Sequence, residues 1–169
     1  PEDGQTNTAL TPTDTGPGED PSFARDIALL HSVGVRVVVV HGGGPQLTEE
    51  LAAQQIESKF VDGLRVTTGE TLKAAQRVFQ RAGATLADAI QAKGCHARPL
   101  TTGIIEAIPS SNPELGLVGE VDRVFTEPIT RAAEQGQIPI ISPVGATAEL
   151  AQHIEQAVMA EVDNDGEKR

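Results

Sequence analysis

The chain has 169 residues, a length that predicts one domain with a sizeable buried core. Its 24 acidic and 13 basic side chains give a net charge of −11, which argues against nucleic acid and anionic membranes as partners. Trp and Tyr are absent and Cys95 is the single cysteine, which excludes an internal disulfide, a multi-cysteine metal site and extensive base stacking.

Residues 1–21 carry five acidic side chains and no basic one, together with four prolines and three glycines. This composition predicts a disordered tail rather than a secretory signal peptide. Residues 22–154 hold 14 acidic and 11 basic side chains, so the part expected to fold is close to neutral. No apolar run reaches the roughly 18 residues that a membrane-spanning helix needs. We therefore predict a cytoplasmic protein.

The first folded elements are a helix and a buried strand. A helix is predicted from Ser22 to Ser32, because apolar residues recur at three- and four-residue spacing, and Gly34 ends it. Residues 35–40 form a nearly continuous β-branched run, typical of a buried parallel strand. Three glycines follow, and Pro45 then suits the first turn of another helix.

The rest of the chain continues the alternation of helix and strand. Residues 56–67 are predicted to be extended, with a turn at Asp62–Gly63. Thr68 can cap a helix whose apolar pattern is interrupted at Gly83 and ends near Gly94. Beyond it we expect strands at 96–100, 103–108, 117–125 and 138–141, a turn at 110–113, and helices at 127–135 and 148–161. This order predicts an α/β fold with a mostly parallel sheet covered on both faces.

The sharpest chemical signal is the run of Gly42, Gly43 and Gly44 between a strand and the start of a helix. Glycines lack Cβ, so their amides can approach an anion closely. A helix N-terminus adds unpaired N–H groups and a partial positive charge. The loop therefore suits a phosphate, or a carboxylate that becomes an acyl phosphate. A tight turn without a ligand is an equally good interpretation of the three glycines alone.

Other chemistries fit the residues less well. No Lys-Ser or Lys-Thr pair closes the loop as in a Walker A motif, and G-x-G-x-x-G is absent. An esterase would need a Gly-x-Ser-x-Gly nucleophile, which none of the serines provides. Glu120 and Asp122 share a face of their predicted strand, but we interpret them as exposed carboxylates rather than a magnesium site. The histidines show no metal spacing, although His41 could contact the loop backbone, and we predict no metal site.

Several motifs in a fixed order resemble the amino acid kinase family, and within it the acetylglutamate kinases. They are HGGGPQL (41–47), GLRVTT (63–68), RPLTTGIIEA (98–107), LGLVGEV (115–121) and IPIISPVG (138–145). The segment DIALLHSVGVR (26–36) is also similar to the kinase-like domain of N-acetylglutamate synthases. The resemblance covers residues 22–150, which would form the N-terminal substrate lobe of such a kinase. Residues 151–169 would then hold a C-terminal helix and a polar tail.

The resemblance implies a three-layer αβα sandwich and a phosphotransferase of arginine biosynthesis. Such enzymes transfer the γ-phosphoryl group of MgATP to the side-chain carboxylate of N-acetyl-L-glutamate. The amides of Gly42, Gly43 and Gly44 would hold the transferring phosphoryl group, and Gly43, Gly44 and Arg65 would bind the substrate. Arg65 would hold the α-carboxylate, which suits a guanidinium because it forms two parallel hydrogen bonds. A homo-oligomer is also implied.

Two motifs of the family are not found in this sequence. The family has an early Lys-x-Gly-Gly strand, whereas the first lysine here is Lys59. After SPVG it has an Asn-x-Asn-Ala-Asp segment and a nucleotide lobe with a second catalytic lysine, whereas only Lys168 follows here. We find no catalytic lysine and no ATP site, and because one such cation can be worth about 10²–10³ in rate, we expect little kinase activity from this chain alone.

Two alternatives remain open at this point. The chain could be a non-catalytic regulatory module that binds arginine, as the kinase-like domain of an N-acetylglutamate synthase does. It could also be an interaction protein in which an open sheet edge at 138–142 pairs with a second copy, because an unpaired edge strand invites pairing.

Overall fold

The computed structural model describes residues 21–148, so the predicted acidic tail and all but the start of the predicted helix at 148–161 lie outside the described residues. In chain order the elements are α1 (Pro21–Ser32), β1 (Val39–Val40), α2 (Gly44–Ala53), β2 (Phe60–Val61), β3 (Leu64–Arg65), α3 (Gly69–Gln91), β4 (His96–Leu100), β5 (Ile105–Pro109), the short 3-10 helix η1 (Pro113–Leu115), β6 (Gly119–Val124), α4 (Glu127–Glu134) and β7 (Gln137–Ile141).

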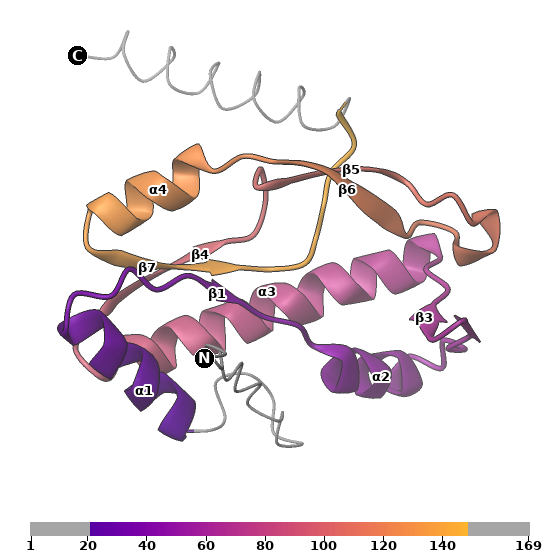
Figure 1. The fold of residues 1–169 in the computed structure, drawn as a ribbon. Coiled ribbons are helices and arrows are strands. Elements are labelled where there is room, and N and C mark those ends of the chain that lie inside the picture. The colour runs from indigo at the N-terminus through magenta and orange to yellow at the C-terminus, as the bar shows by residue number, and fades with distance from the viewer. Residues whose placement is uncertain (1–20, 149–169) are drawn as a thin grey trace, which may run out of the picture.

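Three parallel strands form the central sheet, in the order β1-β7-β4 (Figure 1). Val39 lies opposite Ile140, and Leu100 lies opposite Ile141. Helices α1 and α3 pack on one face of the sheet, and α4 packs on the other. The predicted α/β fold, with a parallel sheet between two helical layers, is confirmed.

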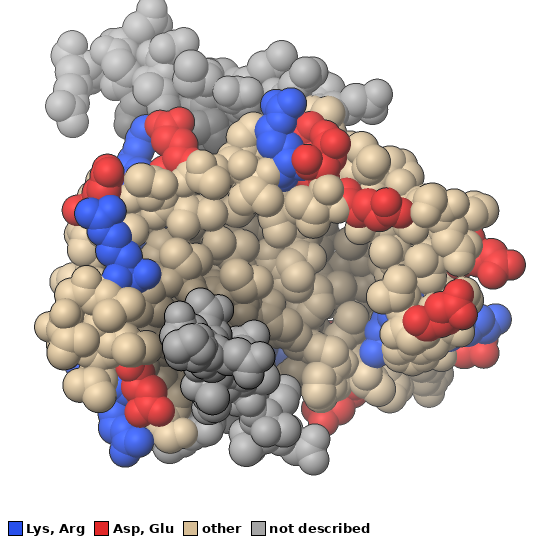
Figure 2. Space-filling view, in the orientation of Figure 1, with Lys and Arg blue, Asp and Glu red and all other residues tan. Residues whose placement is uncertain are grey.

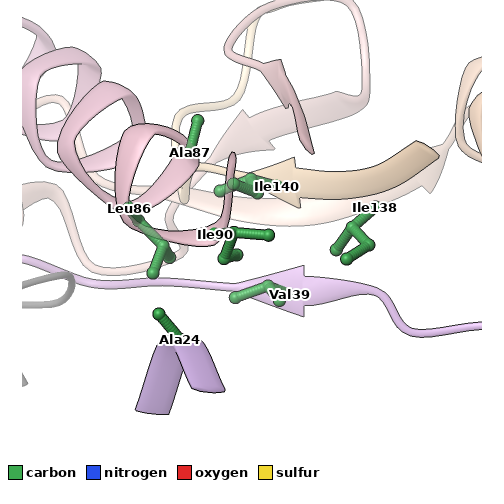
Figure 3. Packing of buried hydrophobic residues seen from close by; sticks show 7 residues of the cluster. All are labelled: Ala24, Val39, Leu86, Ala87, Ile90, Ile138 and Ile140. Atoms are coloured by element: carbon green, nitrogen blue, oxygen red, sulfur yellow. The ribbon is translucent and has the colours of Figure 1, made fainter. Parts of the chain in front are cut away.

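The main core lies between the sheet and the layer of α1 and α3 (Figure 3). Leu86 and Ile90 of α3 meet Ile138 and Ile140 of β7, and all four side chains are fully buried. Ile141 points to the opposite face, where it packs with Leu100, Ile104 and Ile129. The buried residues of the cluster in Figure 3 are all aliphatic, and the partly buried Phe23 packs against them.

The predicted buried strand at 35–40 is only partly present. Only Val39 and Val40 are in strand conformation, and they pair on one side alone, with β7. Val39 is buried against α3, whereas Val35, Val38 and Val40 are exposed. The prediction of a buried strand was therefore wrong for most of this run, because within residues 21–148 only the side that faces α1 and α3 is covered.

The predicted open edge at 138–142 was also wrong. Strand β7 is the central strand, and it pairs with β1 on one side and with β4 on the other. Its N–H and C=O groups are therefore engaged within the sheet, and pairing with a second copy through this strand is excluded. The reason is topological: the last strand in the described sequence inserts between two earlier ones.

Helix α3 runs unbroken over 23 residues. Thr68 caps it as predicted, since its Oγ1 accepts a hydrogen bond of 3.2 Å from the amide of Thr71. Gly83 does not interrupt the helix: it lies within it, buried, and a Cβ there would be 3.0 Å from Nε2 of His41. Packing against His41 therefore explains this glycine.

Two antiparallel hairpins accompany the parallel sheet. The turn between β2 and β3 lies at Asp62 (φ 50°) and Gly63 (φ 80°), where the sequence predicted it. The hairpin of β5 and β6 contains a bulge between Glu106 and Ala107. Its strands are shorter than the predicted stretches, and η1 lies in the connection for which only a turn was expected.

In Figure 2 most of the visible charged side chains lie around the rim of the face shown. Acidic and basic residues are interspersed there, so the net negative charge is not gathered into one acidic patch on this face. Among the helices of residues 21–148, none has both the length and the apolar character required to cross a bilayer.

Candidate ligand site at the glycine loop

The glycine loop joins the end of β1 to the start of α2. The amide of His41 donates a 3.1 Å hydrogen bond to the carbonyl of Ile141, which extends the pairing of β1 with β7 by one residue. Pro45 lies in the first turn of α2, as predicted from its fixed φ. The loop is therefore fixed to the sheet at one end and to a ten-residue helix at the other.

The backbone amides of the loop are free of partners in the described part of the chain. Neither Gly42 nor Gly43 donates a hydrogen bond to any residue of 21–148. Gly44 is the first residue of α2, so its N–H has no acceptor within the helix. Three consecutive donors thus remain at a helix N-terminus, an arrangement that can bind an anion.

Space around the loop distinguishes the three glycines. A Cβ on Gly42 or Gly44 would meet no atom within 4 Å, and neither residue has the positive φ that favours glycine. A Cβ on Gly43 would lie 2.9 Å from Cδ1 of Phe79. Packing accounts for glycine at position 43, and the helical conformation before Pro45 favours glycine at position 44. Neither reason applies to Gly42, and the open space next to the amides of Gly42 and Gly44 can accommodate a ligand.

Arg65 lies on β3, and its guanidinium carbon is 4.6 Å from the centre of the Phe60 ring. One guanidinium nitrogen donates to Oγ of Ser58, and the other terminal nitrogen donates to Oγ1 of Thr48 at 2.8 Å. Both contacts and the ring restrict the side chain to one position, which prepares the guanidinium to bind an anion at little entropic cost.

Thr48 connects Arg65 to the glycine loop. It lies on the first turns of α2, and its Oγ1 donates a 2.9 Å hydrogen bond to the carbonyl of Gly44 while it accepts from Arg65. The structure therefore brings Arg65 and Gly44, two of the residues predicted for the site, to one side chain.

Three residues of this arrangement were missed in the sequence: Thr48, Ser58 and Phe60. Phe60 could have been found, because a two-residue turn at Asp62–Gly63 places it opposite Arg65 in the hairpin, as observed. Thr48 carries no such local signal, since its contact with Arg65 depends on how α2 packs beside the hairpin.

The carboxylate of Glu120 has a structural role within the β5–β6 hairpin. It accepts hydrogen bonds from the amide of Ser111 at 2.8 Å and from the hydroxyl groups of Ser110 and Ser111. These hydrogen bonds, led by the one from the Ser111 amide, hold the pKa of Glu120 below its ordinary value. Glu120 and Asp122 are both exposed, and no group of three metal-ligating side chains is found within residues 21–148.

Comparison with known proteins identifies the family of this chain and several relatives. The model of the amino acid kinase family matches residues 8–165. The acetylglutamate kinase of Jannaschia sp. is 42% identical over 132 residues, which cover 76% of this chain and 46% of that protein. The acetylglutamate kinase of Xanthomonas campestris pv. campestris is 40% identical over 126 residues, which cover 75% of this chain and 30% of that enzyme.

Solved structures show the same fold. The crystal structure of smu.665 from Streptococcus mutans UA159 has a TM-score of 0.71 at 25% identity, and the match covers 75% of this chain and 53% of that one. The N-acetylglutamate synthase of Neisseria gonorrhoeae, solved with coenzyme A and N-acetyl-glutamate, has a TM-score of 0.64 at 24% identity and is matched over 30% of its length.

The chain spans less than half the length of these curated relatives, from 30% to 46%. The family match, in contrast, extends over nearly the whole chain, from residue 8 to residue 165. The parallel sheet, the strand that leads into the glycine loop and this match give one answer: the chain belongs to the amino acid kinase family.

Proposed function

We propose that this chain is the acceptor-binding part of an acetylglutamate kinase-type phosphotransferase and that it binds N-acetyl-L-glutamate. The observation that carries the proposal is the pair of hydrogen bonds at Thr48: its hydroxyl accepts from the guanidinium of Arg65 and donates to the carbonyl of Gly44. In the proposed complex, Arg65 binds the α-carboxylate of the ligand. The amides of Gly42, Gly43 and Gly44 face the side-chain carboxylate and the phosphoryl group transferred to it.

The donor in this proposal is MgATP, which supplies the γ-phosphoryl group. The described residues fit the acceptor better than the donor. No lysine of residues 21–148 makes a hydrogen bond or ion pair with the glycine loop, and Lys59 is exposed and lies 3.5 Å from Glu57. We therefore propose that the chain by itself binds the acceptor and transfers phosphoryl groups slowly. The cytoplasmic location and the homo-oligomer remain predictions.

Replacing Arg65 tests the proposed carboxylate contact. Arg65→Ala is expected to weaken N-acetyl-L-glutamate binding by about 10- to 100-fold, because a charge-assisted hydrogen bond is worth roughly 1.5–3 kcal/mol. Arg65→Lys keeps the charge but loses the bidentate geometry, so it is expected to recover only part of the affinity. The measurement is isothermal titration calorimetry, with NMR titration for the weaker variants.

Arg123→Ala is the matched control, because Arg123 also lies over a phenylalanine ring, 5.9 Å from the centre of Phe125, but on β6. It should bind like the parent chain. Equal affinity of Arg65→Ala and the parent chain contradicts the assignment of Arg65. A parent chain that binds L-arginine but not N-acetyl-L-glutamate favours the regulatory module instead.

Gly44→Ala tests the loop with a small change. Apart from the flanking residues, no atom lies within 4 Å of the added Cβ, but a Cβ before Pro45 disfavours the helical conformation, so a modest fall in melting temperature is expected. Thermal unfolding checks that the variant keeps its fold. The methyl group would occupy the space next to the amides, and binding of N-acetyl-L-glutamate should drop about tenfold or more.

Gly69→Ala is the control for this substitution. Gly69 is the first residue of α3 and also has no atom within 4 Å of its Cβ position. It should fold like the parent chain and keep full affinity. Undiminished binding by Gly44→Ala places the ligand elsewhere.

A further inference from the structure

We propose that His41 is a positioning residue for the glycine loop: its imidazole holds the carbonyl of Gly42 so that the amide of Gly43 is presented to the ligand. The inference rests on the proposed function, because it assigns how one donor of that site is oriented. The argument depends on a buried ring, one hydrogen bond and the planarity of one peptide bond.

His41 is buried, with 6% of its surface exposed, at the end of β1. Its own amide donates a hydrogen bond to the carbonyl of Ile141, so its backbone is held by the sheet. A buried polar ring needs a hydrogen-bond partner, because an unsatisfied one would cost roughly 1–3 kcal/mol. Nδ1 of His41 finds this partner at 3.1 Å, in the carbonyl oxygen of Gly42.

The chemistry of this contact assigns the proton. A carbonyl oxygen only accepts hydrogen bonds, so Nδ1 must carry the hydrogen. In the neutral ring Nε2 is then unprotonated, and it faces Gly83. The hydrogen bond thus selects one of the two neutral tautomers of His41.

The absence of a side chain at Gly83 leaves space for the imidazole of His41. Gly83 is buried within α3, where glycine costs about 0.5–1 kcal/mol relative to alanine, and a Cβ there would lie 3.0 Å from Nε2 of His41. The missing side chain allows the ring to pack between the helix and the loop. The ring is therefore fixed from both sides, by the helix and by the carbonyl of Gly42.

The planar peptide bond between Gly42 and Gly43 couples the direction of the Gly42 carbonyl to the direction of the Gly43 N–H. All described peptide bonds are trans, so the carbonyl of Gly42 and the N–H of Gly43 point in opposite directions. Because the carbonyl is turned toward the buried imidazole, the N–H of Gly43 is turned away from it. This N–H has no acceptor within residues 21–148, so the hydrogen bond to His41 aims a free donor away from the core.

Two isosteric amides separate this role from a merely structural one. In His41→Asn the side-chain amide nitrogen can take the place of Nδ1, whereas in His41→Gln it reaches toward the position of Nε2. We expect His41→Asn to bind N-acetyl-L-glutamate within about threefold of the parent chain, and His41→Gln to bind about tenfold more weakly, the value of one hydrogen bond. Thermal unfolding of both variants checks that they fold.

Gly83→Ala tests the same role without changing the sequence of the glycine loop or His41. The added methyl group would displace the imidazole, so we expect weaker binding here too, with Gly69→Ala as the control. The tautomer of His41 is read without any ligand, from the ¹⁵N chemical shifts of the ring, and Nδ1–H is expected.

The outcomes separate the two proposals. An Nε2–H tautomer, or equal affinity of the Asn and Gln variants, overturns the positioning role even if the parent chain binds its ligand. A parent chain that shows the Nδ1–H tautomer but binds no N-acetyl-L-glutamate overturns the proposed function, and with it the role assigned to His41.

Discussion

Leu86→Ala is expected to lower the free energy of unfolding by about 3 kcal/mol, within the range of about 2–5 kcal/mol for buried leucines. Leu86 is fully buried in the cluster of Figure 3, which joins residues of α1, β1, α3 and β7. Its removal leaves a cavity among aliphatic side chains that are held by the sheet, so the site cannot collapse easily. Urea unfolding followed by circular dichroism measures the change.

Leu29→Ala is the control for this substitution, because Leu29 lies on α1 with 62% of its surface exposed. It should change the free energy of unfolding by less than about 0.5 kcal/mol. If Leu86→Ala lowers the free energy of unfolding no more than Leu29→Ala does, Leu86 does not lie in a core between α3 and the sheet.

Gly116→Ala is expected to lower the free energy of unfolding by about 3 kcal/mol, for two reasons. The residue has φ 67° and ψ −119°, a conformation that costs a side chain of order 1–3 kcal/mol. The added Cβ would also lie 2.6 Å from the carbonyl oxygen of Thr67, which is backbone and cannot rotate away. The same urea experiment measures the loss.

The Gly116→Ala substitution is also expected to affect the candidate site. The amide of Thr67 donates to Leu115 at 2.9 Å, and the amide of Leu117 donates to Thr67 at 2.7 Å, so the substitution disturbs the segment that follows Arg65. We therefore expect weaker binding of N-acetyl-L-glutamate as well.

Gly136→Ala separates the two causes of this loss. Gly136 has φ 71°, but no atom lies within 4 Å of its Cβ position. It should cost about 1–2 kcal/mol from the backbone alone. If Gly116→Ala is no worse than Gly136→Ala, the close contact with Thr67 is refuted.

Local features of the fold could be predicted from the sequence. The cap at Thr68 and the turn at Asp62–Gly63 depend on residues within three positions of one another, and both were found where predicted. The same holds for β4, whose bounds agree with the prediction. Each depends on backbone preferences that a few neighbouring residues determine.

Features that depend on distant segments could not be predicted in this way. The β-branched run at 35–40 indicated a buried strand, but most of its valines are exposed, and β1 is an edge strand within residues 21–148. The apolar run at 138–141 was expected at an edge, yet it lies in the centre. Strand composition indicates a tendency to form strands, whereas burial and strand order depend on long-range packing and pairing.

The candidate site shows the same division. The glycine run and Arg65 were identifiable from sequence motifs, and the packing of α2 beside the β2–β3 hairpin was not. Gly83 is the clearest case: the sequence marked it as an interruption of a helix, and its reason is a histidine 42 positions earlier.

The central place of β7 has a consequence for how the sheet can assemble. β1 and β4 do not pair with each other in the described sheet. Neither strand can pair in this sheet until β7 has been synthesised, about a hundred residues after β1. Until then, the aliphatic faces of α1 and α3 have only an incomplete surface to cover. Such non-local closure slows folding, and it makes the compaction of residues 21–148 dependent on the arrival of β7.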